Sequence, residues 1–341
     1  MDLYSTAALM GVVRNLMTPT TFFLDRYFPR LVTSDTEEIA VDIEINRRRV
    51  APFVSPLVQG KIVSSQGSQT RTFKPAYIKD KRAPDLRRPV RRAIGERIGG
   101  GEMSTAEREA ANLMTEMQDQ MDMLTRRMEL MACEALRTGK VIVKGDGYDS
   151  VEVNFGRPSG NTVALTSTAR WGESGVSPGT DIEGWILAMV KASGATVQDI
   201  VMDPKAWALF IADASVKDSI STEFRNGASS LNLGPEIRPG AVWKGIWGTY
   251  NLWVHSDWYI DPADDTEKAF LPDYTVMLLS PFIEGIRSFG TVMDPAHNYA
   301  AEPYAVKSWL QDDPAQRFLM MQSAPLMIPF RPAASFCATV R

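Results

Sequence analysis

The sequence has very few of the residues that carry most enzyme chemistry. Among its 341 residues there are only two histidines, His255 and His297, and only two cysteines, Cys133 and Cys337. Two histidines exclude a multi-histidine metal site and leave only these two for any nucleophile–histidine pair. Two cysteines are too few for a disulfide framework and fit a reducing cytosol. We therefore expect no catalytic residue, no resident metal and no cofactor.

Long hydrophobic runs and catalytic motifs are also missing. No stretch approaches the roughly 18 apolar residues that span a bilayer, so we expect no contact with a membrane. The sequence has no P-loop, dinucleotide-binding, nucleophile-elbow or zinc-protease motif. An acidic cluster lacks the spacing of a calcium loop and is interpreted as a solvated loop; it consists of Asp261, Asp264, Asp265 and Glu267. An enzyme that depends on His255 or His297 is the least favoured of three hypotheses.

Positive charge is concentrated in one segment. Ten basic residues stand against three acidic ones between Arg71 and Arg97, a net charge of +7. Since the whole chain carries −4, the remainder carries −11. Such a segment is typical of an arm that docks on the acidic surface of a like subunit, of a nucleic-acid contact, or of a solvated basic loop. The nucleic-acid alternative is a cytosolic binding protein that uses residues 71–97, although the segment has no series of stacking aromatic residues.

The residue patterns predict an α+β chain, with 44% hydrophobic and 23% charged residues. Residues 1–17 are expected to form a short helix capped by Ser5 or Thr6, and residues 39–45 alternate as a strand does. Two strand-like runs, 57–64 and 69–78, predict a long hairpin. A capping box at Ser104 and Glu107 opens an apolar stripe that lasts until Gly139, which predicts a helix of about 34 residues, roughly 50 Å long.

After the long helix, the sequence predicts a hairpin and then a second compact unit. A hairpin is expected over residues 141–155, and Pro204 at a first helical position predicts a helix that starts there. A further helix is expected around residues 188–193. Six of the eight tryptophans fall between residues 185 and 258, which marks a second α+β unit over roughly 180–295.

This order of segments resembles the major capsid protein of tailed bacteriophages, and more specifically the phage lambda-type family with its Hong Kong 97-type fold. The residues that carry the resemblance are Phe22–Arg30, Val50–Pro56 followed by Gly60, Thr72–Arg82, Asp203–Phe210, Leu271–Asp273, and Gln322–Met327 preceded by Asp313, Pro314 and Ala315. The resemblance implies an N-terminal arm over 1–50, an extended E-loop hairpin over 51–100 and a peripheral domain with a long spine helix over 101–180. It further implies an axial domain over 181–295 and a return to the peripheral domain over 296–341.

The resemblance also implies which residues meet a neighbouring subunit. Contacts are expected from the E-loop and its base at Lys61, Arg71, Lys74, Lys79, Lys81, Arg82, Arg87, Arg88, Arg91 and Arg92, and from the N-terminal arm at Phe22, Phe23, Tyr27 and Phe28. The implied function is a major head protein that assembles as hexamers and pentamers into the icosahedral shell of a virion, built in the host cytoplasm. The implied partners are a separate scaffolding protein, a decoration protein at three-fold sites, a portal, and packaged double-stranded DNA on the inner face.

Overall fold

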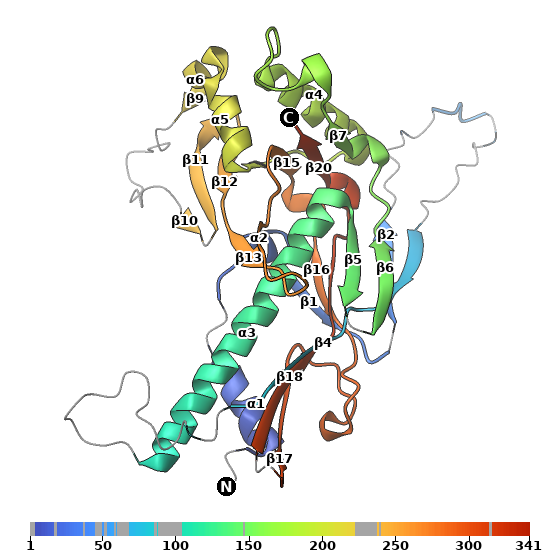
Figure 1. Cartoon of the computed structure of the whole chain (residues 1–341). Coiled ribbons are helices and arrows are strands. Elements are labelled where there is room, and N and C mark those ends of the chain that lie inside the picture. The colour runs from blue at the N-terminus through green and yellow to red at the C-terminus, as the bar shows by residue number, and fades with distance from the viewer. Residues whose placement is uncertain are drawn as a thin grey trace, which may run out of the picture.

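The protein is an α+β chain, as expected, and one long helix runs through a large part of the folded molecule (Figure 1). The computed structural model describes residues 4–16, 19–36, 38–44, 50, 53–57, 59, 68–84, 87, 104–145, 147–221, 237–238, 240–313 and 316–341. The α-helices among them are α1 Thr6–Asn15, α2 Phe23–Tyr27, α3 Thr105–Thr138, α4 Pro178–Ser193, α5 Pro204–Ala212 and α6 Ala214–Ser219. Within these ranges no helix is long and apolar enough to cross a membrane.

The long helix α3 begins and ends at the residues that the sequence predicts. The Ser104 hydroxyl accepts the backbone N–H of Glu107 at 3.2 Å, and the Glu107 carboxylate accepts the backbone N–H of Ser104 at 2.7 Å. Gly139 ends the helix in the left-handed conformation, with a φ of 73°, which a residue without a Cβ adopts at little cost. The methionine stripe is core and not a binding groove, since Met117, Met121 and Met128 are buried.

The largest sheet has eight strands and separates two apolar layers. Its strands run in the order β10 Ile237–Arg238, β11 Ala241–Trp247, β12 Tyr250–His255, β8 Asp199–Met202, β15 Thr275–Leu279, β20 Ser335–Thr339 and β7 Thr162–Ala164, with β9 Ile220–Ser221 paired to β11. Because side chains alternate along a strand, Ile200 and Met202 of β8 pack with the layer formed by α4 and α5, whereas Val201 packs in the cluster that includes α3. The spine helix and helix α4 therefore cover opposite faces of this sheet.

Smaller sheets flank the spine helix. One contains β1 Arg30–Thr33, β16 Ile286–Phe289 and β19 Pro325–Ile328, and another contains β17 Ala305–Gln311, β18 Gln316–Ser323 and β4 Ile78–Arg82. Three two-stranded sheets are β2 Ile39–Glu44 with β3 Ser68–Phe73, β5 Lys140–Gly145 with β6 Tyr148–Asn154, and β13 Trp258–Ile260 with β14 Glu267–Ala269. The predicted strand near 39–45 and the hairpin after α3 are confirmed.

The strand expected over 69–78 is wrong in its length and in its place. Strand β3 ends at Phe73, and β4 begins at Ile78 in a different sheet. Pro75 lies between them, and a proline has no N–H to donate to a ladder. Strand β3 pairs with β2 along its whole length; the expected partner run, 57–64, lies almost entirely outside the described residues.

The expected helix near 188–193 proves to be the last part of a longer one. Helix α4 begins at Pro178, inside a stretch that is rich in glycine, serine and threonine. Helix α5 begins at Pro204 as predicted, with Asp203 as its N-cap. The division of the chain into arm, E-loop, peripheral and axial domains remains a prediction.

Candidate functional site

The residues predicted to contact a neighbour fall into three groups in the structure. Lys61, Arg88, Arg91 and Arg92 lie outside the described residues, and Arg71 is described only as a backbone position of β3. Lys74, Lys79, Lys81 and Arg87 are exposed, whereas Arg82 is only partly exposed. The structure of a single chain does not test their role between subunits, so these contacts remain predictions.

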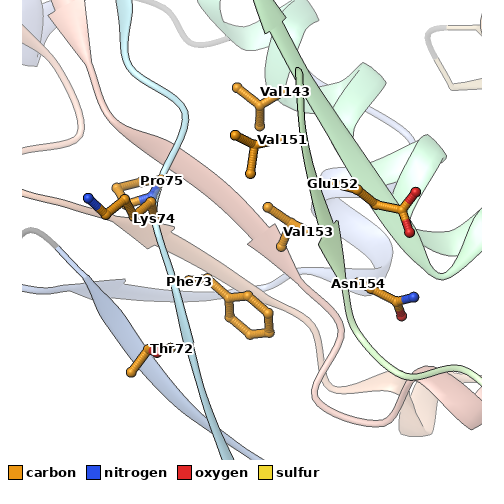
Figure 2. Close-up of a pocket in the computed structure, with 9 residues that line it drawn as sticks. All are labelled: Thr72, Phe73, Lys74, Pro75, Val143, Val151, Glu152, Val153 and Asn154. Atoms are coloured by element: carbon orange, nitrogen blue, oxygen red, sulfur yellow. The ribbon is translucent and has the colours of Figure 1, made fainter. Parts of the chain in front are cut away.

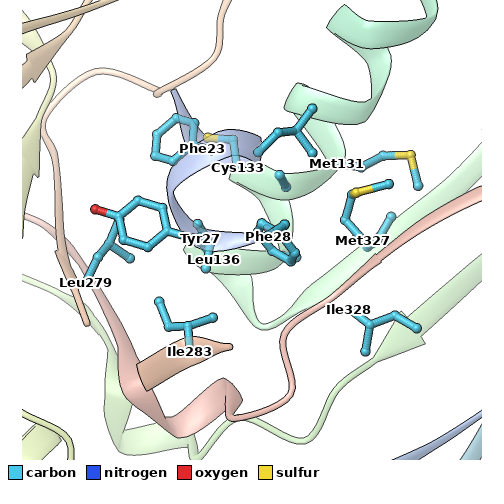
Figure 3. Packing of buried hydrophobic residues seen from close by; sticks show 14 of the residues in the cluster. Phe23, Tyr27, Phe28, Met131, Cys133, Leu136, Leu279, Ile283, Met327 and Ile328 are labelled. Carbon is cyan, nitrogen blue, oxygen red and sulfur yellow. The ribbon is translucent and has the colours of Figure 1, made fainter. Parts of the chain in front are cut away.

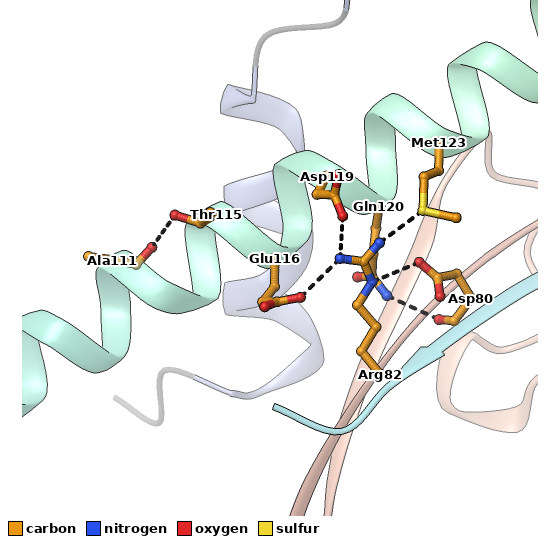
Figure 4. A network of polar contacts seen from close by, with 8 residues as sticks. All are labelled: Asp80, Arg82, Ala111, Thr115, Glu116, Asp119, Gln120 and Met123. Atoms are coloured by element: carbon orange, nitrogen blue, oxygen red, sulfur yellow. Dashed lines mark hydrogen bonds and ion pairs between the residues drawn. The ribbon is translucent and has the colours of Figure 1, made fainter. Parts of the chain in front are cut away.

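Arg82 anchors strand β4 to the spine helix of its own chain (Figure 4). Its guanidinium donates to Asp80 at 3.0 Å, to Glu116 at 2.9 Å and to Asp119 at 2.6 Å. Gln120 of α3 also donates to the backbone carbonyl of Asp80 at 3.1 Å. Burial alone would lower the pKa of Arg82, but the hydrogen bonds to Glu116 and Asp119 raise it above its ordinary value. Much of the positive charge of Arg82 is therefore balanced within the chain.

Lys79 and Lys81 occupy the alternate positions of β4 and are exposed. The Lys81 ammonium lies 4.1 Å from the ring centroid of Phe318 and 5.3 Å from that of Trp309. The Lys79 ammonium lies 5.0 Å from the ring of Tyr77. Cation–π contacts of this kind hold the lysine stems against the sheet while the charges remain near water.

The aromatic residues predicted as N-terminal arm contacts are enclosed by their own chain; Figure 3 shows Phe23, Tyr27 and Phe28 among their neighbours. Phe22, Phe23 and Phe28 are 0% exposed and Tyr27 is 2% exposed. They pack in one cluster with Cys133 and Leu136 of α3 and with residues of the large sheet, among other buried side chains. Burial of their apolar area stabilises the single chain, and their contact with a neighbour remains a prediction.

A buried carboxylate on the spine helix holds this N-terminal segment in place. Glu129 is 5% exposed, and its side chain accepts the backbone N–H groups of Phe22 at 3.0 Å, Phe23 at 2.7 Å and Leu24 at 2.8 Å. Burial raises the pKa of Glu129 to about 7, although these three hydrogen bonds oppose the rise. The sequence interpretation missed Glu129; the available signal was a carboxylate beside the apolar stripe of α3.

A second buried carboxylate ties the same segment to the large sheet. Asp199 at the start of β8 is 1% exposed and accepts two hydrogen bonds from Arg26, at 2.7 and 2.8 Å, and one from the Tyr27 hydroxyl at 2.8 Å. Asn251 and the Trp253 indole also donate to it, at 3.0 and 3.1 Å. No local sequence pattern singles out Asp199, because the residues that donate to it lie more than fifty positions away in the chain.

An apolar groove of about 440 Å³ lies between β3 and the β5–β6 hairpin (Figure 2). It is lined by Thr72, Phe73, Lys74, Pro75, Val143, Val151, Glu152, Val153 and Asn154. Four of these side chains are large and apolar, and Lys74 and Glu152 bring one charge of each sign. Glu152 of this lining accepts a hydrogen bond from Lys140 at 2.8 Å, and the apolar walls suit the groove to binding an apolar segment.

The two histidines and the acidic cluster were also candidate functional groups in the sequence. His297 lies 3.9 Å from Glu302, a carboxylate that the sequence interpretation did not pair with it. His255 is 2% exposed, and burial lowers its pKa to about 4, so it is neutral at pH 7. In the acidic cluster, Lys268 donates to both Asp261 and Asp264, at 2.6 and 2.9 Å. Across the described ranges no group of His, Cys, Asp and Glu side chains is placed to hold a metal ion.

Comparisons with known proteins agree with one another. A family model described as phage major capsid protein E matches residues 5–340. The major capsid proteins of Escherichia phages N15 and lambda are 30% and 29% identical to this chain over 335 residues, which covers 96% of each chain. The crystal structure of a prophage capsid protein from E. coli CFT073 is similar with a TM-score of 0.74 and 22% identity, covering 99% of both chains. The capsid of Ralstonia phage GP4 is similar with a TM-score of 0.52 and 12% identity, over 95% of this chain and 91% of that one.

Proposed function

Because this chain belongs to the phage major capsid protein E family, we propose that its copies join through segments that reach from one subunit onto the next. The chain is the major capsid protein of a tailed double-stranded DNA phage, a structural protein of the virion and not an enzyme. Its copies form the icosahedral head, and its fold is of the Hong Kong 97 type. The proposal concerns how those copies contact one another.

In the proposed arrangement, hexamers and pentamers form when the basic segment 71–97 of one copy lies on the acidic body of its neighbour. The charge distribution carries this proposal: +7 on the segment against −11 on the rest of the chain. Opposite charges steer the association of two subunits and define the register of their contact. A contact of this kind can also dissociate, so that a wrongly placed subunit can leave the growing shell. A separate scaffolding protein, a decoration protein at three-fold sites, a portal and DNA on the inner face complete the proposed set of partners.

The ion pairs of Arg82 indicate that it is not one of the basic residues that contact the neighbouring subunit. Its charge is taken up by Asp80, Glu116 and Asp119 of the same chain, so it supports the base of the segment. We therefore assign the contact with the neighbour to the other basic residues of the segment, and test it at Arg87, Arg88, Arg91 and Arg92.

The proposal is tested by assembly of the purified chain, alone and after co-expression with the neighbouring genes. We expect closed shells or hexamer-sized rings in negative-stain electron microscopy and sedimentation. A monodisperse monomer in both preparations would contradict it.

Reversal of the segment's charge tests the proposed contact directly. We expect the quadruple variant Arg87→Glu, Arg88→Glu, Arg91→Glu and Arg92→Glu to abolish shells while the monomer stays folded, because like charges would then face each other. The matched control replaces the same four residues with lysine, which keeps the charge and should retain assembly. Circular dichroism checks the monomer, and normal particles from the glutamate variant would refute the contact.

A further inference from the structure

Two buried titratable side chains contact the Phe22–Phe23 pair at the start of α2. Glu129 of α3 accepts the backbone N–H groups of Phe22 and Phe23, at 3.0 and 2.7 Å. The ring centroid of His255 in β12 lies 4.9 Å from that of Phe23 and 5.9 Å from that of Phe22. Glu129 is 5% exposed and His255 is 2% exposed. The attachment of α2 to the spine helix therefore involves groups whose charge changes with pH.

Within the part of the chain that the structure describes, Glu129 has no basic partner to balance its charge. Of the two charged residues of α2, Arg26 binds Asp199, and Asp25 is a like charge that opposes ionisation of Glu129. Strands β19 and β20, which also pack on α3, contain no charged residue. The other titratable neighbour is Cys133 on α3, whose pKa is raised by burial, so the thiol stays neutral. The three backbone N–H groups are thus the main compensation for a charge on Glu129.

His255 changes its charge in a different pH range. Burial lowers the pKa of His255 to about 4, although Asp257 beside it opposes the change. The Nδ1 atom of His255 is buried without a hydrogen-bond partner, so a charge on this ring would also lack compensation. Between pH 5.5 and pH 8 the ring therefore stays neutral, and Glu129 is the group beside α2 whose charge changes.

The charged form of Glu129 favours detachment of α2. In the attached state, burial raises the pKa of Glu129 from 4.5 to about 7, and the three N–H donors offset this rise only in part. When α2 leaves the spine helix, water reaches the carboxylate and its pKa returns towards its ordinary value. The attached state therefore binds the proton more tightly than the detached state, and attachment weakens as the pH rises from 4.5 to 7.

We propose that Glu129 is a pH-sensitive latch for the N-terminal segment: the neutral side chain holds α2 against the spine helix, and the charged side chain loosens it. Detachment would expose the rings of Phe22, Phe23 and Phe28, which are 0% exposed in the attached state. The pH then controls how much apolar surface the unassembled chain presents to other molecules. The latch acts within one chain and does not depend on the proposed contacts between copies.

Hydrogen exchange of the unassembled chain tests the latch. The backbone amides of Phe22, Phe23 and Leu24 are followed at pH 5.5 and pH 8, corrected for intrinsic exchange rates, and compared with those of β8, which report global opening. We expect the opening constant at the three amides to be about tenfold or more larger at pH 8 than at pH 5.5. A change below about twofold, a change of the opposite sign, or an equal change in β8 would overturn the proposal.

Three variants identify the group that responds to pH. Glu129→Gln cannot ionise, so its opening constant at these amides should be equal at the two pH values. The matched control Glu183→Gln changes an exposed carboxylate of α4 and should keep the wild-type response. Gly285→Ala should raise exchange at both pH values, because a Cβ at position 285 would overlap the backbone oxygen of Tyr27 and displace α2. A wild-type response in Glu129→Gln would overturn the proposal, since another group would then sense the pH.

Discussion

A buried carboxylate such as Glu129 is under two opposing influences. Loss of water destabilises its charged form, while three backbone N–H groups of Phe22, Phe23 and Leu24 stabilise that form. Burial is the larger effect, and the pKa rises from 4.5 to about 7. The folded chain therefore keeps a proton on Glu129 at pH values where the unfolded chain has lost it.

This difference predicts how stability depends on pH. Between about pH 4.5 and pH 7, protonation of Glu129 favours the folded state, so its contribution falls as the pH rises and is constant above pH 7. We expect Glu129→Gln to abolish this dependence of the free energy of unfolding on pH. We also expect it to lower the free energy of unfolding by about 1–3 kcal/mol, because the NH₂ group of the new amide would face a backbone N–H donor. Denaturant unfolding of the unassembled chain from pH 5 to pH 8 measures both effects.

His255 requires a specific comparison in that experiment. Its pKa is lowered to about 4 by burial, so the neutral ring is favoured in the folded state and stability rises with pH between about 4 and 6.5. The difference between wild type and Glu129→Gln removes this effect, because both chains contain His255. An unchanged slope in the variant would show that Glu129 is already ionised at pH 5.

Single residues were the least predictable part of this chain. The sequence predicts a contact with a neighbour for Phe22, Phe23, Tyr27 and Phe28, and did not predict that they are buried within their own chain. Nothing in the local pattern distinguishes an aromatic residue that packs on its own spine helix from one that packs on another subunit. The partners that decide this, Glu129 and Asp199, lie more than a hundred residues away.

At the scale of one element, the side chain of Arg157 caps the C-terminal end of the spine helix α3. Arg157 donates to the carbonyls of Leu136 at 2.7 Å and Arg137 at 2.6 Å, in the last turn of α3. These carbonyls have no partner within the helix, and a cation also balances the negative end of the helix dipole. Burial lowers the pKa of Arg157 to about 10, which still leaves it charged at pH 7.

Gly139 permits this cap because it has no side chain. A Cβ at position 139 would lie 2.5 Å from the Cβ of Arg157, at a φ of 73°. We expect Gly139→Ala to lower the free energy of unfolding by about 2 kcal/mol or more, from left-handed strain plus the displaced arginine. Thermal unfolding of the unassembled chain measures the loss.

Gly147 provides the matched control for that substitution. Its φ is 76°, but a Cβ there would meet no atom within 4 Å. Gly147→Ala should therefore cost only the backbone strain, about 1 kcal/mol. Equal losses from the two variants would mean that the Arg157 cap shifts without cost.

Elements were predictable where their signals are local. The capping box of α3, Pro204 at the start of α5 and the alternation of β2 each act within a few residues, and each prediction is confirmed. Strand pairing was not predictable in the same way. Strand β4 joins β18, whose residues come more than two hundred positions later, and register between such distant strands depends on packing that one sequence does not display.

At the scale of the whole molecule, helix α2 connects parts that the chain order keeps separate. Its backbone N–H groups bind Glu129 of the spine helix, and Arg26 and Tyr27 bind Asp199 of the large sheet. Arg287 of β16 donates to Asp25 and to the carbonyl of Phe28, both at 2.7 Å. The five residues of helix α2 and their neighbour Phe28 thus link α3, β8 and β16 through hydrogen bonds and ion pairs.

Removal of the carboxylate charge of Asp199 tests how much this link stabilises the fold. In Asp199→Asn the new amide group must face at least two of the five donors, and the Arg26 charge loses its partner. We expect the free energy of unfolding to fall by about 3 kcal/mol, measured by guanidinium unfolding with tryptophan fluorescence, to which Trp253 beside Asp199 contributes. The control Asp265→Asn changes an exposed carboxylate and should be nearly neutral; equal stability of the two variants would contradict the role of Asp199.

The position of β20 has a consequence for how the chain reaches this fold. Strand β20, residues 335–339, lies between β15 and β7 near one side of the eight-stranded sheet, so β7 has no partner until β20 is in place. Neighbouring strands so distant in sequence require large loops to close first, which slows folding relative to helical proteins of similar stability. A nascent chain that has been synthesised as far as β15 therefore still exposes unpaired edges of β15 and β7. These edges need protection from association with other chains until β20 has been made.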